Sequence, residues 1–275
     1  MNTADARFSF DHDLHIHSYL SACSSDPAQS TQRILRYAID EGLSMICVTD
    51  HYWDSAIFCP SFWYAPQNYE HVAESLPLPQ SPDVRFMFGC ETEMDSDFEL
   101  GIPLSRFDDF DFVIIPTTHL HMTGHVITEK DAASLESRAR LWVERLDALL
   151  DKPLPFHKIG IAHLACRLIA PSSHEDYLKT LDMIPTKEME RLFRKAARLG
   201  VGIELNSDDM RFSDEDADTV LRMFRIAKAQ GCRFYLGSDA HHPDALSGAR
   251  EIFERAIDLL DLRESDKFQF CSKNS

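Results

Sequence analysis

The chain has 275 residues, of which 44% are hydrophobic and 27% are charged, a composition that indicates an ordinary globular protein with one large domain over residues 1–275. The formal net charge of −17 argues against binding to nucleic acid or to an anionic membrane, because both attract basic surfaces. No run approaches the roughly 18 apolar residues that span a bilayer, and seven scattered Cys without a CxxC pair indicate a reducing compartment, so we expect a cytoplasmic protein.

Short apolar runs alternate with amphipathic ones along the chain. The expected strands lie near 10–16, 44–49, 84–90, 111–117, 158–163, 201–206 and 233–238. The expected helices cover about 26–42, 128–150, 186–200, 213–231 and 243–262, with an irregular insertion at about 52–82 and a loose tail at about 264–275. This repeated order predicts parallel strands, in either an open doubly wound sheet or a closed barrel.

Nearly every expected strand ends in a side chain that can bind a metal. In parallel α/β folds the carboxyl ends of the strands converge on one face, so these side chains are expected to meet. Alone, each has a simpler explanation, such as a turn acceptor or a helix cap, but their placement after six strands makes the simpler explanations improbable together. The residues are His15, His17, His51, Glu91, His119, His163, Asp239 and His241.

The ordered motifs DLHIHS, VTDH, GCE, His119, AHL and GSDAH resemble the PHP (polymerase and histidinol phosphatase) family from residue 11 to 260. The resemblance implies a distorted (β/α)7 barrel with two or three divalent ions, either zinc, manganese or iron, that hydrolyses phosphate esters. It also implies three sets of ligands, which are His15, His17, Glu91 and Asp239 for one ion, Glu91, His119 and His163 for a second, and His51 with His241 for a third.

Two positions leave the ligand set open. Relatives similar to histidinol phosphatases often carry another His eight residues after the first ligand, where this chain has Cys23. A thiolate binds zinc but suits hard ions poorly, and the nearby Asp26 is a substitute that could equally cap a helix. In THLHM both His119 and His121 are candidates, and His119 is favoured because it directly follows the strand.

The stretch ELNSDDMR resembles the pattern E-[IV]-N-T-x-x-[LM]-R at the sixth strand of histidinol phosphatase relatives. The resemblance implies that Arg211 clamps the substrate phosphate and that Asn206 points into the pocket, with Arg167 as a second phosphate-binding candidate.

Other polar residues near the motifs have candidate catalytic roles. Asp13 and Asp50 are expected either to orient ligand imidazoles or to accept hydrogen bonds from the backbone. His241 or His242 is expected to protonate the leaving alkoxide.

Together, the motifs favour metal-dependent hydrolysis of a small phosphate monoester, with histidinol phosphate as one candidate, by a hydroxide that bridges two ions. The alternatives are a PHP-type hydrolase for nucleotides, phosphotyrosine or nucleic acid, and a noncatalytic metal-binding regulatory domain.

Overall fold

A computed structural model describes residues 6–24 and 26–270 of the chain. Its centre is a sheet of parallel strands in the order β1-β2-β4-β5-β6-β7-β8, with the short β3 paired to β4. The strands are β1 (His12–Ile16), β2 (Met45–Val48), β3 (His51–Tyr52), β4 (Arg85–Thr92), β5 (Phe112–Pro116), β6 (Ile159–Ala162), β7 (Gly202–Asn206) and β8 (Arg233–Gly237). Each of the seven expected strands is therefore confirmed.

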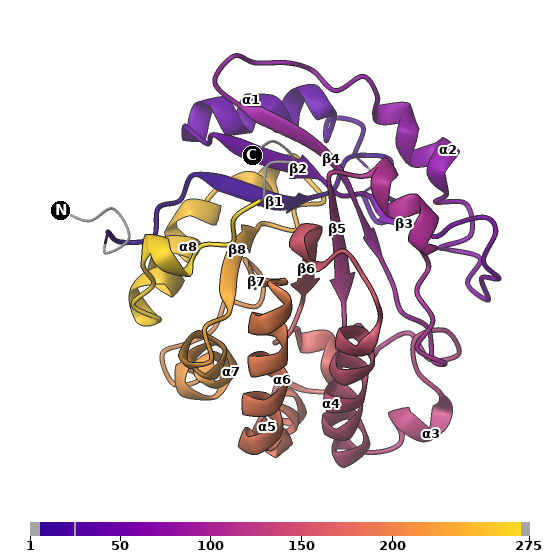
Figure 1. Ribbon diagram of the computed structural model, residues 1–275, viewed down its shortest axis with the longest axis vertical. Coiled ribbons are helices and arrows are strands. Elements are labelled where there is room, and N and C mark those ends of the chain that lie inside the picture. The colour runs from indigo at the N-terminus through magenta and orange to yellow at the C-terminus, as the bar shows by residue number, and fades with distance from the viewer. Residues whose placement is uncertain (1–5, 25, 271–275) are drawn as a thin grey trace.

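The sheet curls until its two edge strands, β1 and β8, meet, with the helices arranged around the outside (Figure 1). At this seam the backbone N–H of Asp239 donates to the carbonyl of His15 at 2.7 Å. A side chain also links the two edges: Asp13 Oδ1, on β1, accepts a hydrogen bond from the N–H of Ser238, just after β8, at 2.9 Å. The predicted (β/α)7 barrel of PHP type is confirmed.

The expected second strand continues past its predicted end by changing neighbours. The N–H of Thr49 donates to the carbonyl of Ile16 on β1 at 2.8 Å, whereas the carbonyl of Asp50 accepts from the N–H of Glu91 on β4 at 3.1 Å. The chain then pairs again as β3, where His51 lies opposite Glu91. This change of partner brings the His51 side chain next to that of Glu91.

The helices follow strands in the sequence, the last of them after β8, and cover the outside of the sheet (Figure 1). No helix in the described residues is long and apolar enough to cross a bilayer. The helices are α1 (Thr31–Glu41), α2 (Tyr69–Val72), α3 (Glu129–Ala132), α4 (Leu135–Asp151), α5 (His174–Met183), α6 (Thr186–Leu199), α7 (Ala217–Ala229) and α8 (Ala249–Leu259).

Helix boundaries differ from the expectation in three places. The first helix begins at Thr31 because the Ser30 side chain accepts from the N–H of Arg33, while Asp26 accepts from Ala28 in a separate turn. The expected helix at 128–150 is two helices, because Ser134 caps α4 anew. The expected last helix is a 3₁₀ turn, η6 (Pro243–Leu246), followed by α8.

The inside of the barrel is filled by its own apolar cluster. Gly160 is required there, because a Cβ at this position would collide with the rings of Tyr235 and Phe112. The tail expected to be loose contributes as far as residue 270: the N–H of Phe268 donates to the carbonyl of Phe234 at 2.7 Å, and the Phe268 ring is buried. Residues 271–275 lie outside the described part. The cluster consists of Leu14, Cys47, Met87, Phe112, Ile114, Ala162, Tyr235 and Phe268.

Candidate metal centre

The strand ends surround a cavity of about 660 Å³. Its lining combines metal-binding side chains with apolar and basic ones, and the insertion after β3 contributes Trp63 and Tyr64. His15 and His17 are completely buried beside the lining residues Glu91 and Asp239. The lining residues are Cys23, His51, Trp63, Tyr64, Glu91, His119, His121, Met122, His163, Cys166, Arg167, Leu168, Asp208, Asp209, Arg211, Asp239 and His241.

Glu91 lies at the centre of the imidazoles. Its Oε2 is 2.9 Å from His51 Nδ1 and 3.3 Å from His17 Nε2, and its Oε1 is 3.5 Å from His163 Nε2. Burial alone would raise the pKa of Glu91, but the charges of His51 and His15 outweigh it and hold that pKa well below the ordinary value. Both oxygens are buried without a hydrogen-bond partner among the described residues. Such orphaned acceptors beside imidazoles fit a bound cation.

Asp239 completes the centre from the opposite strand. Its Oδ1 lies 3.1 Å from His17 Nε2 and 3.3 Å from His15 Nε2, and its Oδ2 lies 3.4 Å from His163 Nε2. Asp239 and His163 both have left-handed backbone, with φ of 55° and 60°. This conformation is uncommon outside glycine and is found where a site imposes it. The backbone after β6 and β8 is therefore turned to present these two side chains.

Five groups of three residues could each hold an ion, and some residues belong to two groups. Within each group, the three donor atoms lie within 4.8 Å of one another. The four residues expected around the first ion are brought together, and His119 rather than His121 belongs to these groups. The triplets are His15 with Glu91 and His163, His15 with His17 and Asp239, Glu91 with Glu93 and His119, His119 with His163 and Cys166, and His17 with His51 and His241.

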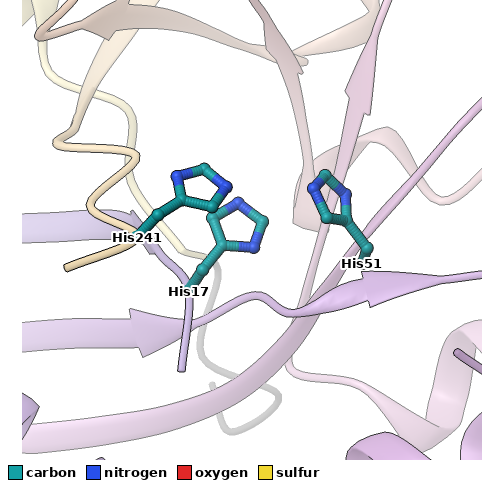
Figure 2. Close-up of side chains that lie close together, drawn as sticks. All are labelled: His17, His51 and His241. Carbon is teal, nitrogen blue, oxygen red and sulfur yellow. The ribbon is translucent and has the colours of Figure 1, made fainter. Parts of the chain in front are cut away.

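The last triplet corresponds to the expected third set of ligands, with one change. Figure 2 shows the imidazoles of His17, His51 and His241 gathered from three different segments. The His17 ring stacks on that of His241 at 4.1 Å and lies 4.5 Å from that of His51. Cys23 lines the cavity but joins none of the donor groups found among the described residues. Beside His51 and His241, the donor group contains His17.

Two carboxylates that the sequence analysis did not predict, Glu204 and Glu93, contact the Nδ1 atoms of His15 and His119. Glu204 Oε1 lies 2.6 Å from His15 Nδ1, and Glu93 Oε1 is hydrogen-bonded to His119 Nδ1. The first pair leaves His15 Nε2 beside Glu91 and Asp239, the usual arrangement behind a metal-binding His. The signals were present: Glu93 follows Glu91 by two positions, the spacing of side chains on one face of a strand, and Glu204 interrupts the apolar run VGIELN.

Replacing Glu204 with Gln is expected to weaken metal binding about 10- to 100-fold, because a neutral amide orients His15 less firmly and makes it a poorer donor. The affinity for zinc can be measured by competition with a chromophoric chelator. Glu215→Gln, the same change at an exposed position, should leave the affinity unchanged. Equal zinc affinity in both variants would count against the positioning role of Glu204.

Asp50, a candidate catalytic residue, lies behind the site. Its carboxylate accepts from the N–H and Oγ of Ser18 and from Ser21 Oγ, at 2.6 to 2.7 Å. Ser21 Oγ in turn lies 2.8 Å from His17 Nδ1, so Asp50 reaches the imidazole only through a hydroxyl. Asp13 accepts from the backbone instead, which is the second of its two expected roles. Neither residue lines the cavity.

Three further candidates also point elsewhere. The half-exposed His242 caps η6 by accepting from the N–H of Asp244, and its Nε2 pairs with Asp26 at 2.9 Å. This pairing places both His242 and Asp26 outside the cavity lining. Asn206 is buried and donates from its amide to Glu204 Oε2 at 3.2 Å, so it steadies that carboxylate rather than facing the cavity.

The wall beside the donor groups carries both arginines expected to bind phosphate, Arg167 and Arg211. Arg211 is half-exposed, with its Nε 3.2 Å from Asp208 Oδ1. Asp209, which the sequence reasoning did not single out, lines the same wall and accepts from the N–H of Ala165 at 3.2 Å. Burial raises the pKa of Asp209 to about 7. The wall thus offers cations and one carboxyl group that holds a proton readily.

Comparison with known proteins agrees with this arrangement of fold and site. The model of the PHP domain matches residues 13–238, and the chain belongs to the PHP domain family. Over 256 residues it is 28% identical to a probable phosphatase of Aliivibrio fischeri (strain MJ11), a match that covers 90% of this chain and 84% of the relative.

Two solved structures share the fold. The histidinol phosphate phosphatase of Lactococcus lactis subsp. lactis Il1403, crystallised with zinc, L-histidinol and phosphate, has a TM-score of 0.58 and 19% identity, over 90% of this chain and 93% of that one. A putative histidinol phosphatase of Listeria monocytogenes has a TM-score of 0.53 and 10% identity, over 88% and 99% of the two chains.

Proposed function

We propose that this protein is a metal-dependent phosphatase that hydrolyses a small phosphate monoester, with histidinol phosphate as the first candidate substrate. The observation that carries the proposal is the pair of carboxylates Glu91 and Asp239, which lie among imidazoles from several strand ends. Both Glu91 oxygens and Asp239 Oδ1 are buried and have no hydrogen-bond partner in the described part of the chain. The zinc, L-histidinol and phosphate in the Lactococcus lactis structure support it by analogy of fold.

Two or three divalent ions, chosen among zinc, manganese and iron, fit the donor groups. When bound, such ions neutralise phosphate oxygens and make a hydroxide nucleophile available near neutral pH. Their charge is local, so the phosphate group of a small molecule can enter although the whole chain carries −17. The same acidic chain repels polynucleotides, and a cavity of about 660 Å³ suits a small substrate.

The residues of the cavity wall would bind the substrate and donate a proton to the leaving group. Arg211 and Arg167 bind phosphate oxygens, while Trp63, Met122 and Leu168 contact the organic part of the ester and exclude water. His242 lies outside the cavity and His241 belongs to a donor group, so Asp209 is the better donor of a proton to the leaving alkoxide. Asp209 is buried, and burial raises its pKa, which favours the protonated form that this task needs.

Arg211→Met is expected to lower kcat/KM for a phosphate monoester about 10- to 100-fold, mainly by raising KM, because a charge-assisted hydrogen bond to phosphate is lost. Steady-state kinetics with p-nitrophenyl phosphate measure the change. Arg225→Met is the matched control, since Arg225 lies on the surface of α7 and pairs with Asp218. A similar KM in the two variants would show that Arg211 does not bind the substrate.

The proposed function is tested with purified protein whose metal content is determined by elemental analysis. We expect hydrolysis of histidinol phosphate and other phosphate monoesters in a panel that also contains nucleotides, phosphotyrosine and a phosphodiester. Metal bound at full occupancy without cleavage of any ester would instead favour a regulatory metal-binding domain.

A further inference from the structure

Cys166 lies at the edge of the metal centre through the local fold of the chain. The N–H of Cys166 donates to the carbonyl of His163 at 3.1 Å, which closes a tight turn immediately after β6. The turn folds the thiol back toward the imidazole, and Cys166 lines the cavity while being 9% exposed. Its Sγ and donor nitrogens of His119 and His163 all lie within 4.8 Å of one another.

Unpartnered polar atoms occur in this triplet and in the adjoining one, which consists of Glu91, Glu93 and His119. His163 Nδ1, Glu93 Oε2 and Glu91 Oε1 are buried and have no hydrogen-bond partner among the described residues. Buried polar atoms are normally paired, and several orphaned ones in one place indicate an absent ligand. Since the atoms are imidazole nitrogen and carboxylate oxygen, that ligand is a cation.

The usual role of a buried Cys does not account for Cys166. Free Cys commonly serves as a small apolar core residue, as Cys47 and Cys90 do in the two apolar clusters of this fold. Cys166 belongs to neither cluster. Its Sγ accepts a long hydrogen bond from the N–H of Leu168 at 3.4 Å and also interacts with the side chain of His163.

We propose that Cys166 is a thiolate ligand of the ion held by His119 and His163, and that it makes this position selective for zinc. The thiol releases its proton to solvent as the sulfur–metal bond forms. Thiolate and imidazole donors favour zinc, whereas manganese and magnesium prefer oxygen. The inference rests on the metal centre of the proposed function, but it adds a sulfur ligand that the family resemblance did not assign.

Cobalt(II) substitution tests this directly, because a cobalt–thiolate bond adds an intense near-ultraviolet charge-transfer band that N/O sites lack. The wild-type protein loaded with Co²⁺ should show the band, Cys166→Ser should lose it while still binding Co²⁺, and Cys23→Ser should keep it. Cys23 is the matched control because it also lines the cavity. In Cys166→Ser, the ratio of zinc to manganese affinity should fall at least about 10-fold.

The proposal is overturned by a wild-type spectrum without the band, by a band that survives in Cys166→Ser, or by one that disappears in Cys23→Ser. If Cys166→Ser does not fold, alkylation of the wild-type protein decides: zinc should protect Cys166 from iodoacetamide, and equal labelling with and without zinc refutes the bond. The band without phosphatase activity would refute the proposed function alone, and activity without the band would refute the thiolate alone.

Discussion

Glu91→Gln is expected to lower kcat/KM for p-nitrophenyl phosphate by at least about 10³-fold, since the proposed metal centre would supply several kcal/mol of transition-state stabilisation. Glu91 contacts His17, His51 and His163 at once, and within the described part of the chain neither of its oxygens has a hydrogen-bond partner. The neutral amide removes the charge that draws cations to this position.

The measurement is steady-state hydrolysis together with elemental analysis of the same samples. Metal content should fall by at least one ion per chain, while Glu215→Gln, an exposed control, retains both metal and activity. A Glu91→Gln variant with full metal content and activity would contradict a centre built around this carboxylate.

Arg145→Met is expected to destabilise the fold by about 4 kcal/mol. Arg145 is completely buried on α4, and its guanidinium donates to the carbonyls of Thr117, Asp95, Val126 and Met94 at 2.6 to 3.0 Å. Burial lowers its pKa to about 10, so it stays charged at neutral pH. Met fills much of the space but leaves these acceptors without a donor, at a cost of about 1 kcal/mol or more each.

Urea unfolding followed by circular dichroism measures this loss. Arg140→Met on the same helix is the control: Arg140 is half-exposed and pairs with Glu144, so its removal should cost less than about 1 kcal/mol. Similar losses in the two variants would show that the buried hydrogen bonds contribute little.

The carbonyls that Arg145 binds flank the site, since Met94 follows Glu93 and Thr117 lies two residues before His119. The arginine therefore also steadies the loops that present these side chains.

Local patterns were sufficient for the strands and for most of the donor set. Runs of apolar residues identify the strands. Because parallel strands have their carboxyl ends on one side, the sequence predicts that His15, Glu91, His163 and Asp239 meet. Helix boundaries were less well determined, because Ser30 and Asp26 are both good caps and only packing selects between them.

The sequence by itself therefore determined the parallel strands and the strand ends at which the donors lie, because these follow from periodicity and order along the chain. The closed barrel was expected only from the resemblance of the motifs to the PHP family. Only the tertiary structure decided how side chains far apart in sequence pair. Glu204 holds His15 across 189 positions, and Asp26 turns His242 away from the cavity. It also placed Cys166 beside His119. Such contacts depend on the curvature of the closed sheet and on turns with unusual backbone, which no local pattern encodes.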